Sequence, residues 1–113
     1  MYPFQSCSIK FHDGIHFWGS NVDINSGVPF DLGRWQMVTL TFDGKTLTIY
    51  KDSQAIKSEA TTLEDAENLV RVGVPGPWGA AAPFAGKIAG FAIWNRALCQ
   101  LEIQALGIDT PKN

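Results

Sequence analysis

The chain has 113 residues, the length of one domain, and its 45% apolar content suits a packed core and excludes a disordered chain. The formal net charge is -2, and the nine Lys and Arg residues are scattered, so nucleic-acid binding is not expected. No apolar run approaches the about 20 residues that span a bilayer, and no signal-peptide pattern opens the sequence. We therefore expect no membrane insertion, and the compartment stays open.

A first hairpin is predicted where Asp13-Gly14 separates two short alternating runs. An Asp-Gly pair favours a two-residue type I′ turn, because both central residues need positive φ. That turn would place Ile9 opposite Trp18. One face then carries Lys10 and His12, so we expect it to face solvent, together with Ser8, Ile15 and Phe17. The predicted core face consists of Cys7, Ile9, Phe11, His16 and Trp18.

The stretch "SNVDINSG" at 20 to 27 is predicted to be an oxygen-rich loop. Asn21, Asp23 and Asn25 alternate along it and carry the hard oxygen ligands that suit Ca²⁺. Ca²⁺ takes about six to eight oxygen ligands, and this stretch supplies a single carboxylate. Asn, Asp and Ser are also ordinary turn residues. These three residues are weak calcium candidates, and no other cofactor is expected.

A second hairpin is predicted at "LTFDGKTLTIY", residues 40 to 50, with its turn at Asp43-Gly44. Residues directly opposite each other share a face of the sheet, so the strands divide into an apolar face and a Thr-rich face. The apolar face is predicted to form one wall of a β core. It consists of Val38, Leu40, Phe42, Leu47 and Ile49.

Three more strands are expected, at 54 to 60, 68 to 74 and 86 to 94. The last of these, "GKIAGFAIW", is apolar, and Gly90 interrupts it as a bulge would. Between the second and third lies the Pro- and Gly-rich loop 75 to 83.

Near the end the apolar period changes to that of a short amphipathic helix, which Gly107 ends. Its predicted apolar face is Leu98, Leu101, Ala105 and Leu106. Many short strands and one terminal helix indicate an all-β antiparallel sandwich or jelly roll, in a single domain over residues 1 to 113.

Two long stretches resemble laminin G-like domains of the concanavalin A-like lectin and glucanase superfamily. They are "RWQMVTLTFDGKTLTIYKDSQ", from Arg34, and "FAGKIAGFAIWNRALCQLEIQAL", from Phe84. The first matches the family's "tFdG" turn and the second its "iWnraLs" strand end. The resemblance covers residues 7 to 106. Ser53 departs from the family, which usually has Gly there, and the family's N-terminal strands have no counterpart.

The shorter N-terminus implies an open sheet edge, because a family strand that lies beside "KIAGFAIW" is missing. Exposed edges of this kind tend to be covered by another chain. We therefore expect a homodimer formed by strand pairing or exchange at this edge. The alternative is a self-contained sandwich in which residues 1 to 6 cover the edge.

Catalysis is not expected. Glycoside hydrolysis needs two carboxylates about 5 to 9 Å apart, and the glucanase pattern ExDxxE does not occur. "EDAE" at 64 to 67 has other spacing, and Glu59 stands alone. His12 and His16 would lie about 13 Å apart on one strand and on opposite faces of the hairpin, so they make no metal site.

The resemblance implies a non-catalytic binding module for carbohydrate or a glycosylated partner. Trp78, in the Pro- and Gly-rich loop, is the ligand-binding candidate, since an exposed Trp can stack on a sugar ring. Packing over the core or in a subunit contact is the alternative role of Trp78. Trp35 and Trp94 match family core positions, and Cys7 and Cys99 are expected to be free, buried thiols. The alternative function is a structural or protein-interaction domain without a ligand site.

Overall fold

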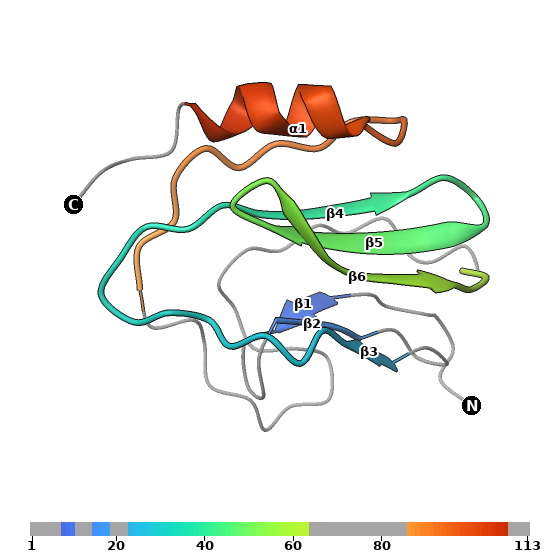
Figure 1. The fold of residues 1–113 in the computed structure, drawn as a ribbon, viewed down its shortest axis with the longest axis horizontal. Coiled ribbons are helices and arrows are strands. Elements are labelled where there is room, and N and C mark those ends of the chain that lie inside the picture. Colours follow the sequence, from blue (N-terminus) through green and yellow to red (C-terminus); the bar gives the residue numbers. More distant parts are fainter. Residues whose placement is uncertain (1–7, 11–14, 19–22, 64–85, 109–113) are drawn as a thin grey trace.

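The computed structural model describes residues 8–10, 15–18, 23–63 and 86–108, and their strands form two antiparallel three-stranded sheets (Figure 1). The strand orders are β1-β2-β3 and β4-β5-β6. The two sheets lie in separate layers, and α1 covers the side of the β4-β5-β6 sheet that faces away from the other sheet (Figure 1). The predicted sandwich with one short C-terminal helix is therefore confirmed. The elements are β1 (Ser8–Lys10), β2 (His16–Trp18), β3 (Asp23–Asn25), β4 (Val38–Phe42), β5 (Thr46–Lys51), β6 (Gln54–Ala60) and α1 (Gln100–Gly107).

The hydrophobic core lies between the sheets. Leu47 and Ile49 are its buried side chains from β5, and Val38, Leu40 and Phe42 of β4 pack against it, as the alternation along this hairpin predicts. The first sheet contributes buried side chains of its own. The fully assembled core is Ile15, Phe17, Ile24, Leu47 and Ile49, with Phe30, Val38, Leu40, Phe42, Ile56 and Leu63 around it.

The turn of the β4–β5 hairpin lies one residue later than predicted. The Asp43 N–H donates to the Thr46 carbonyl at 3.3 Å, so Gly44 and Lys45 are the central residues. Gly44 has φ 97°, and a positive φ at the first central residue alone is the sign pattern of a type II′ turn. Because the register moves by two residues, with Phe42 opposite Leu47, every side chain keeps its predicted face.

The core face predicted for the first hairpin is wrong on β2. Ile9 pairs with Phe17 rather than with Trp18, a slip of one residue that reverses the two faces of β2. Ile15 and Phe17 are buried, and His16 lies on the other face. The cause is β3, whose buried Ile24 stands opposite Phe17.

Strand β3 occupies part of the segment predicted to be a loop. Backbone hydrogen bonds extend the ladder to Ile15, whose N–H donates to the Val28 carbonyl at 2.9 Å and whose carbonyl accepts the Ser26 N–H at 3.0 Å. Pairing with β3, the next strand along the chain, therefore fixes the two faces of β2. Asp13 and Gly14 lie outside the described residues.

The predicted C-terminal helix is confirmed, and its predicted apolar face is correct in part, since Leu106 is half-buried. Ile103 is the buried residue of α1, whereas Leu101 is 75% exposed and Ala105 is also exposed. Leu98, just before the helix, is buried. Contacts with the β5–β6 turn hold α1 in this rotation, since the Ser53 hydroxyl donates to the Ile103 carbonyl at 3.3 Å.

Of the other predicted strands, 54 to 60 is confirmed as β6, and 68 to 74 lies outside the described residues. Residues 86 to 94 do not form a strand. They run as an exposed coil toward α1, with Gly90 at φ 68° (Figure 1).

Candidate functional site

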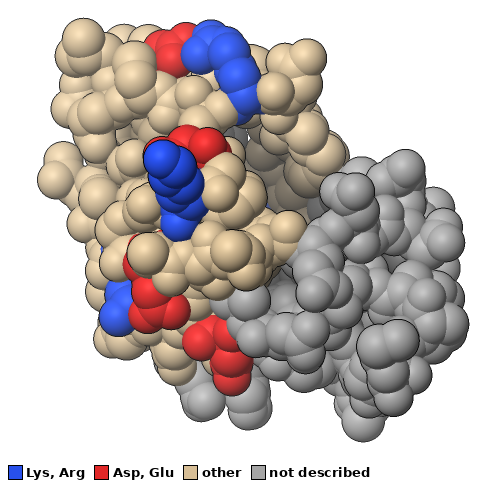
Figure 2. Space-filling view, turned by 90° about the vertical axis from the view of Figure 1, so that its right-hand side faces the viewer, with Lys and Arg blue, Asp and Glu red and all other residues tan. Residues whose placement is uncertain are grey.

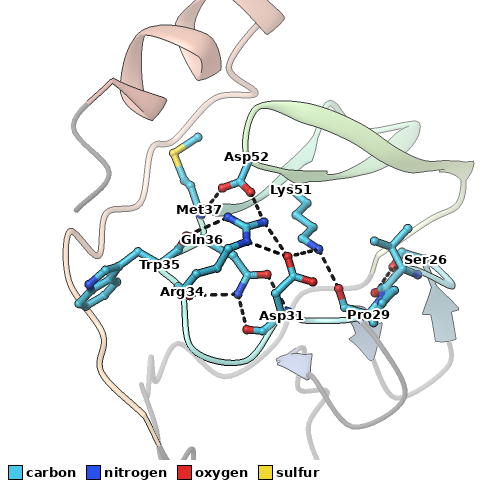
Figure 3. A network of polar contacts seen from close by, with 10 residues as sticks. Ser26, Pro29, Asp31, Arg34, Trp35, Gln36, Met37, Lys51 and Asp52 are labelled. Carbon is cyan, nitrogen blue, oxygen red and sulfur yellow. Dashed lines mark hydrogen bonds and ion pairs between the residues drawn. The ribbon is translucent and has the colours of Figure 1, made fainter. Parts of the chain in front are cut away.

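A network of polar contacts joins the loop that precedes β4 to the end of β5 and the β5–β6 turn (Figure 3). Arg34 is at its centre: Nε donates to Asp31 Oδ2 at 2.8 Å and Nη2 donates to Asp52 Oδ2 at 2.8 Å. Hydrogen bonds from Lys51 and then from Arg34 lower the pKa of Asp31. The same two carboxylates, Asp52 first, raise the pKa of Arg34.

Backbone groups complete this network. The Met37 N–H donates to Asp52 Oδ1 at 3.0 Å, and the Asp52 N–H donates to the Met37 carbonyl at 2.8 Å. The Gln36 side chain bridges the backbone of Asp31, accepting its N–H at 2.9 Å and donating to its carbonyl at 2.7 Å. Each of these charged groups already has a partner within the chain. We interpret the network as a clamp that fixes the loop before β4 to the β5–β6 turn.

A second charged group caps α1. Glu102 Oε1 accepts hydrogen bonds from Arg96 Nη1 at 2.8 Å and from the Cys99 N–H at 2.9 Å, and Arg96 Nη2 pairs with Oε2. The Arg96 hydrogen bonds, followed by the Cys99 N–H, lower the pKa of Glu102 to about 2. This carboxylate stays ionised near neutral pH and satisfies a helix N-terminus, so it is not suited to act as a general acid.

The outer face of the β4-β5-β6 sheet carries hydroxyl groups and no charged strand residue. Thr41 stands opposite Thr48, and Thr48 stands opposite Ser58, so the three hydroxyls form one row across the sheet. Thr48 Oγ1 and Ser58 Oγ are 3.1 Å apart and hydrogen-bonded. The strand residues of this face are Thr39, Thr41, Thr46, Thr48, Tyr50, Ala55, Ser58 and Ala60.

Helix α1 covers the part of this face that lies near the β5–β6 turn (Figure 1). Its contacts are with the β5–β6 turn: Gln100 donates to the Ser53 carbonyl at 2.5 Å, and Gly107 lies against Ser53 and Met37. Thr41, Thr48 and Ser58 are several residues from that turn, and Ser58 is exposed. We call Thr41, Thr48 and Ser58 the hydroxyl row.

A second surface is apolar. Ile88, Phe91, Ile93 and Trp94 lie within seven consecutive residues and are 49%, 59%, 66% and 44% exposed. The backbone of residues 86 to 94 makes no hydrogen bond to another residue in the described part of the chain. We call residues 86–94 the apolar strip. The prediction that Trp94 is a core residue is therefore wrong.

Two of the three calcium candidates, Asp23 and Asn25, lie on β3. Asp23 Oδ1 pairs with His16 Nε2, and Asn25 Oδ1 accepts the Gly27 N–H at 2.9 Å. Asn21 lies outside the described residues. Within the described ranges, no group of three His, Cys, Asp or Glu side chains is placed to hold a metal ion. His16 acts here as the partner of Asp23, and His12 is not described.

Some of the remaining predicted residues lie outside the described part of the chain, and the others can be placed. Trp78, Cys7 and the carboxylates at 64 to 67 lie outside the described residues. Glu59 is 4.0 Å from Lys57 as a weak ion pair, and Trp35 is half-buried. Cys99 is a free thiol, as expected, but it is exposed rather than buried.

On the face shown in Figure 2, each blue side chain lies beside a red one, and these small groups are separated by uncharged residues. No broad basic area occurs on this view of the described residues, which agrees with the scattered Lys and Arg of the sequence. No helix in the described part is long and apolar enough to span a bilayer.

A family model described as the concanavalin A-like lectin/glucanases superfamily matches residues 6–104. The chain belongs to this superfamily. The resemblance to laminin G-like domains is thereby confirmed over nearly the whole chain. Among curated proteins, none matches the chain in sequence.

One solved structure supports the same fold for this superfamily domain. It is a crystal structure of part of an S-layer domain-containing protein from Clostridium thermocellum, with 18% sequence identity and a TM-score of 0.58. The match covers 93% of this chain and 61% of the other, so the chain spans less than two thirds of the crystallised protein. At this identity the likeness concerns the fold alone.

Proposed function

We propose that this domain is a non-catalytic binding module that recognises carbohydrate or a glycosylated partner through the outer face of the β4-β5-β6 sheet. The observation that carries the proposal is the hydroxyl row on a face without charged strand residues. Neutral hydroxyl groups can donate and accept hydrogen bonds, which suits the hydroxyls of a sugar.

The surroundings of two carboxylates support binding without catalysis. Lys51 and Arg34 hold Asp31, and Arg96 holds Glu102, which favours the ionised form of both. Glycoside hydrolysis needs one carboxyl group with a raised pKa, as the general acid. Asp31 and Glu102 have lowered pKa values, which is the opposite arrangement.

The test uses two substitutions that keep shape and remove hydroxyl groups, Thr41→Val and Thr48→Val. A panel of soluble neutral oligosaccharides, namely cello-, xylo-, malto- and chito-oligosaccharides, is screened by calorimetry against the wild type. We expect a member of the panel to bind, and each substitution to weaken it by about 2- to 10-fold, since a neutral hydrogen bond contributes about 0.5–1.5 kcal/mol. Thr46→Val, on the same face but outside the row, is the control.

Two results would count against this function. Absence of binding by every member of the panel at millimolar concentration would remove carbohydrate as the ligand class. Binding that is unchanged in both Val variants would move the site away from the hydroxyl row, and Trp78 would be the next residue to substitute.

A protein-interaction role is the second candidate, and the apolar strip favours it. Four large apolar side chains are exposed within seven residues, and their backbone is unpaired in the described part of the chain. A large contiguous apolar patch on a protein surface commonly marks a site of interaction with a partner. The hydroxyl row and the apolar strip share no residue, so the two roles are separable by mutation.

A further inference from the structure

We infer that the apolar strip of one chain pairs with the apolar strip of a second copy, as antiparallel strands related by a two-fold axis at Phe91. The inference deepens the protein-interaction role proposed above and rests on it. Its starting observations are the exposure of Ile88, Phe91, Ile93 and Trp94 and the lack of backbone hydrogen bonds between residues 86–94 and the rest of the described chain. Free N–H and C=O groups on an extended segment are a template for pairing with another strand.

The sequence of the strip is self-complementary about Phe91. In a two-fold antiparallel pair, residues on either side of the axis meet at equal separation, so Ile88 of one copy stands opposite Trp94 of the other. Phe91 then meets its own counterpart. The remaining pairs are Ala89 with Ile93 and Gly90 with Ala92. Aromatic and β-branched residues are favourable cross-strand partners.

Neighbouring registers are poorer. An axis at Gly90 would set Ile93 opposite Lys87 and Trp94 opposite Gly86. An axis at Ala92 would set Trp94 opposite Gly90. Each of these leaves a large ring without an apolar partner, so the Phe91 register buries the most apolar surface.

Charge also allows the Phe91 register. Lys87 of one copy stands opposite Asn95 of the other, and Arg96 stands opposite Gly86. No two like charges are therefore directly opposed, an arrangement that would destabilise a strand pair. Gly90 has φ 68° in the single chain, and glycine can become extended on pairing with little steric cost.

The size of the surface sets the expected strength. With about 150–250 Å² for a large side chain, the four exposed residues offer on the order of 400 Å² per copy. A standard interface buries about 800 Å² per partner. The dimer is therefore expected to be of micromolar affinity, and it should be measured from about 1 to about 100 μM.

The experiment measures solution mass by light scattering over this range for the wild type, Phe91→Lys and Leu101→Lys. Lys at position 91 would bring two like charges together at the axis, so we expect a monomer. Leu101 is 75% exposed on α1, outside the strip, and Leu101→Lys should remain dimeric. Because Phe91 is 59% exposed, Phe91→Lys should keep the fold, which circular dichroism checks.

A second measurement tests the register. In a Cys7→Ser, Cys99→Ser background, Phe91→Cys would place two thiols opposite each other, and mild oxidation should link the dimer. Ala89→Cys is the matched control, since position 89 meets Ile93 and should not crosslink.

A wild type that stays monomeric at about 100 μM would overturn the inference, as would a dimer that Phe91→Lys leaves intact. Equal crosslinking at positions 89 and 91 would overturn the register. Oligosaccharide binding by the monomeric Phe91→Lys variant is measured in parallel. It tests the carbohydrate proposal independently of dimer formation.

Discussion

The Arg34 guanidinium and the Asp52 carboxylate meet at 2.8 Å, although they are eighteen positions apart in sequence. Asp52 is the first residue of the two-residue β5–β6 turn and has φ 50°, and Arg34 belongs to the loop that leads into β4. The pair therefore joins the connection between the sheets to a turn of the second sheet. Asp52 Oδ1 also accepts the Met37 N–H, so one side chain holds both a charge and a backbone donor.

The double role of Asp52 predicts a graded response to mutation. Asp52→Asn keeps an acceptor for the Met37 N–H and tolerates positive φ, but it removes the charge that pairs with Arg34. Asp52→Ala removes both contacts. We expect Asp52→Ala to have a free energy of unfolding about 2 kcal/mol below that of Asp52→Asn, about half from the lost hydrogen bond and about half from alanine at a positive φ. Urea denaturation of the two variants measures this difference, and equal stabilities would contradict the role assigned to the Met37 contact.

Ser53 predicts a contrast between two small residues. It has φ 71°, which favours Gly, and its hydroxyl contacts the Ile103 carbonyl. Ser53→Ala and Ser53→Gly both lose that contact, but only Ser53→Gly relieves the left-handed backbone. We expect Ser53→Gly to be more stable than Ser53→Ala by about 1 kcal/mol, as judged by thermal and urea denaturation. If Ser53→Ala were the more stable of the two, the turn geometry would be wrong.

The corrected register of β2 predicts which neighbours matter for stability. Phe17 is buried opposite Ile24, so Phe17→Ala should lower the free energy of unfolding by about 3–5 kcal/mol. His16 lies on the outer face and pairs with Asp23, so His16→Ala should change it by about 0.5 kcal/mol or less. If Phe17→Ala leaves too little folded protein, Phe17→Leu gives the same comparison with a smaller loss. A larger loss of stability in His16→Ala than in Phe17→Ala would instead support the predicted core face, with His16 inside.

Glu102 predicts a pH dependence with a defined sign. Its pKa in the folded chain is about 2, against an ordinary value of 4.5, because Arg96 and the Cys99 N–H hold the ionised form. A lowered pKa contributes stability that is complete above the unfolded-state value and is lost as pH falls toward the folded-state value. The stabilising effect of Glu102 should therefore disappear between about pH 4.5 and about pH 2.

Glu102→Gln isolates this contribution. The wild type should melt at a higher temperature than Glu102→Gln near neutral pH, and the two melting temperatures should converge as pH approaches the lower end of the window. Asp31 and Asp43 also have lowered pKa values, so they add to the acid sensitivity of both proteins equally. A difference in melting temperature that stays constant with pH would contradict the assignment to Glu102.

Trp78 remains a proposed ligand platform, and its substitution separates two roles. We expect Trp78→Ala to weaken binding of a neutral oligosaccharide by about 2- to 10-fold, since stacking on an aromatic ring contributes about 0.5–1.5 kcal/mol. The solution mass should stay unchanged. A change in mass without a change in oligosaccharide binding would instead assign Trp78 to a subunit contact.

The β4–β5 hairpin shows how far local patterning reaches. The alternation of Val38, Leu40 and Phe42 with Thr residues identifies the core face, and the Asp-Gly pair places the turn within one residue. That face survives the error because a shift of two residues returns each side chain to the same side of the sheet. Family membership and the short helix were also predictable, since they depend on long matching stretches and on helical spacing.

What only the tertiary structure decided depends on partners that lie outside each local sequence pattern. The pattern around Asp13-Gly14 placed Ile15 and Phe17 in solvent, and pairing with β3 buries them, because Ile24 supplies the apolar surface opposite Phe17. Trp94 was predicted to be core, yet it is exposed in a strip without a neighbouring strand in the described part of the chain. The sequence by itself determined the fold class and the faces of its most regular hairpin. The register of β2 followed from pairing with β3, and the rotation of α1 followed from its contacts with Ser53, about fifty positions away. No local period contains the energy of either set of contacts.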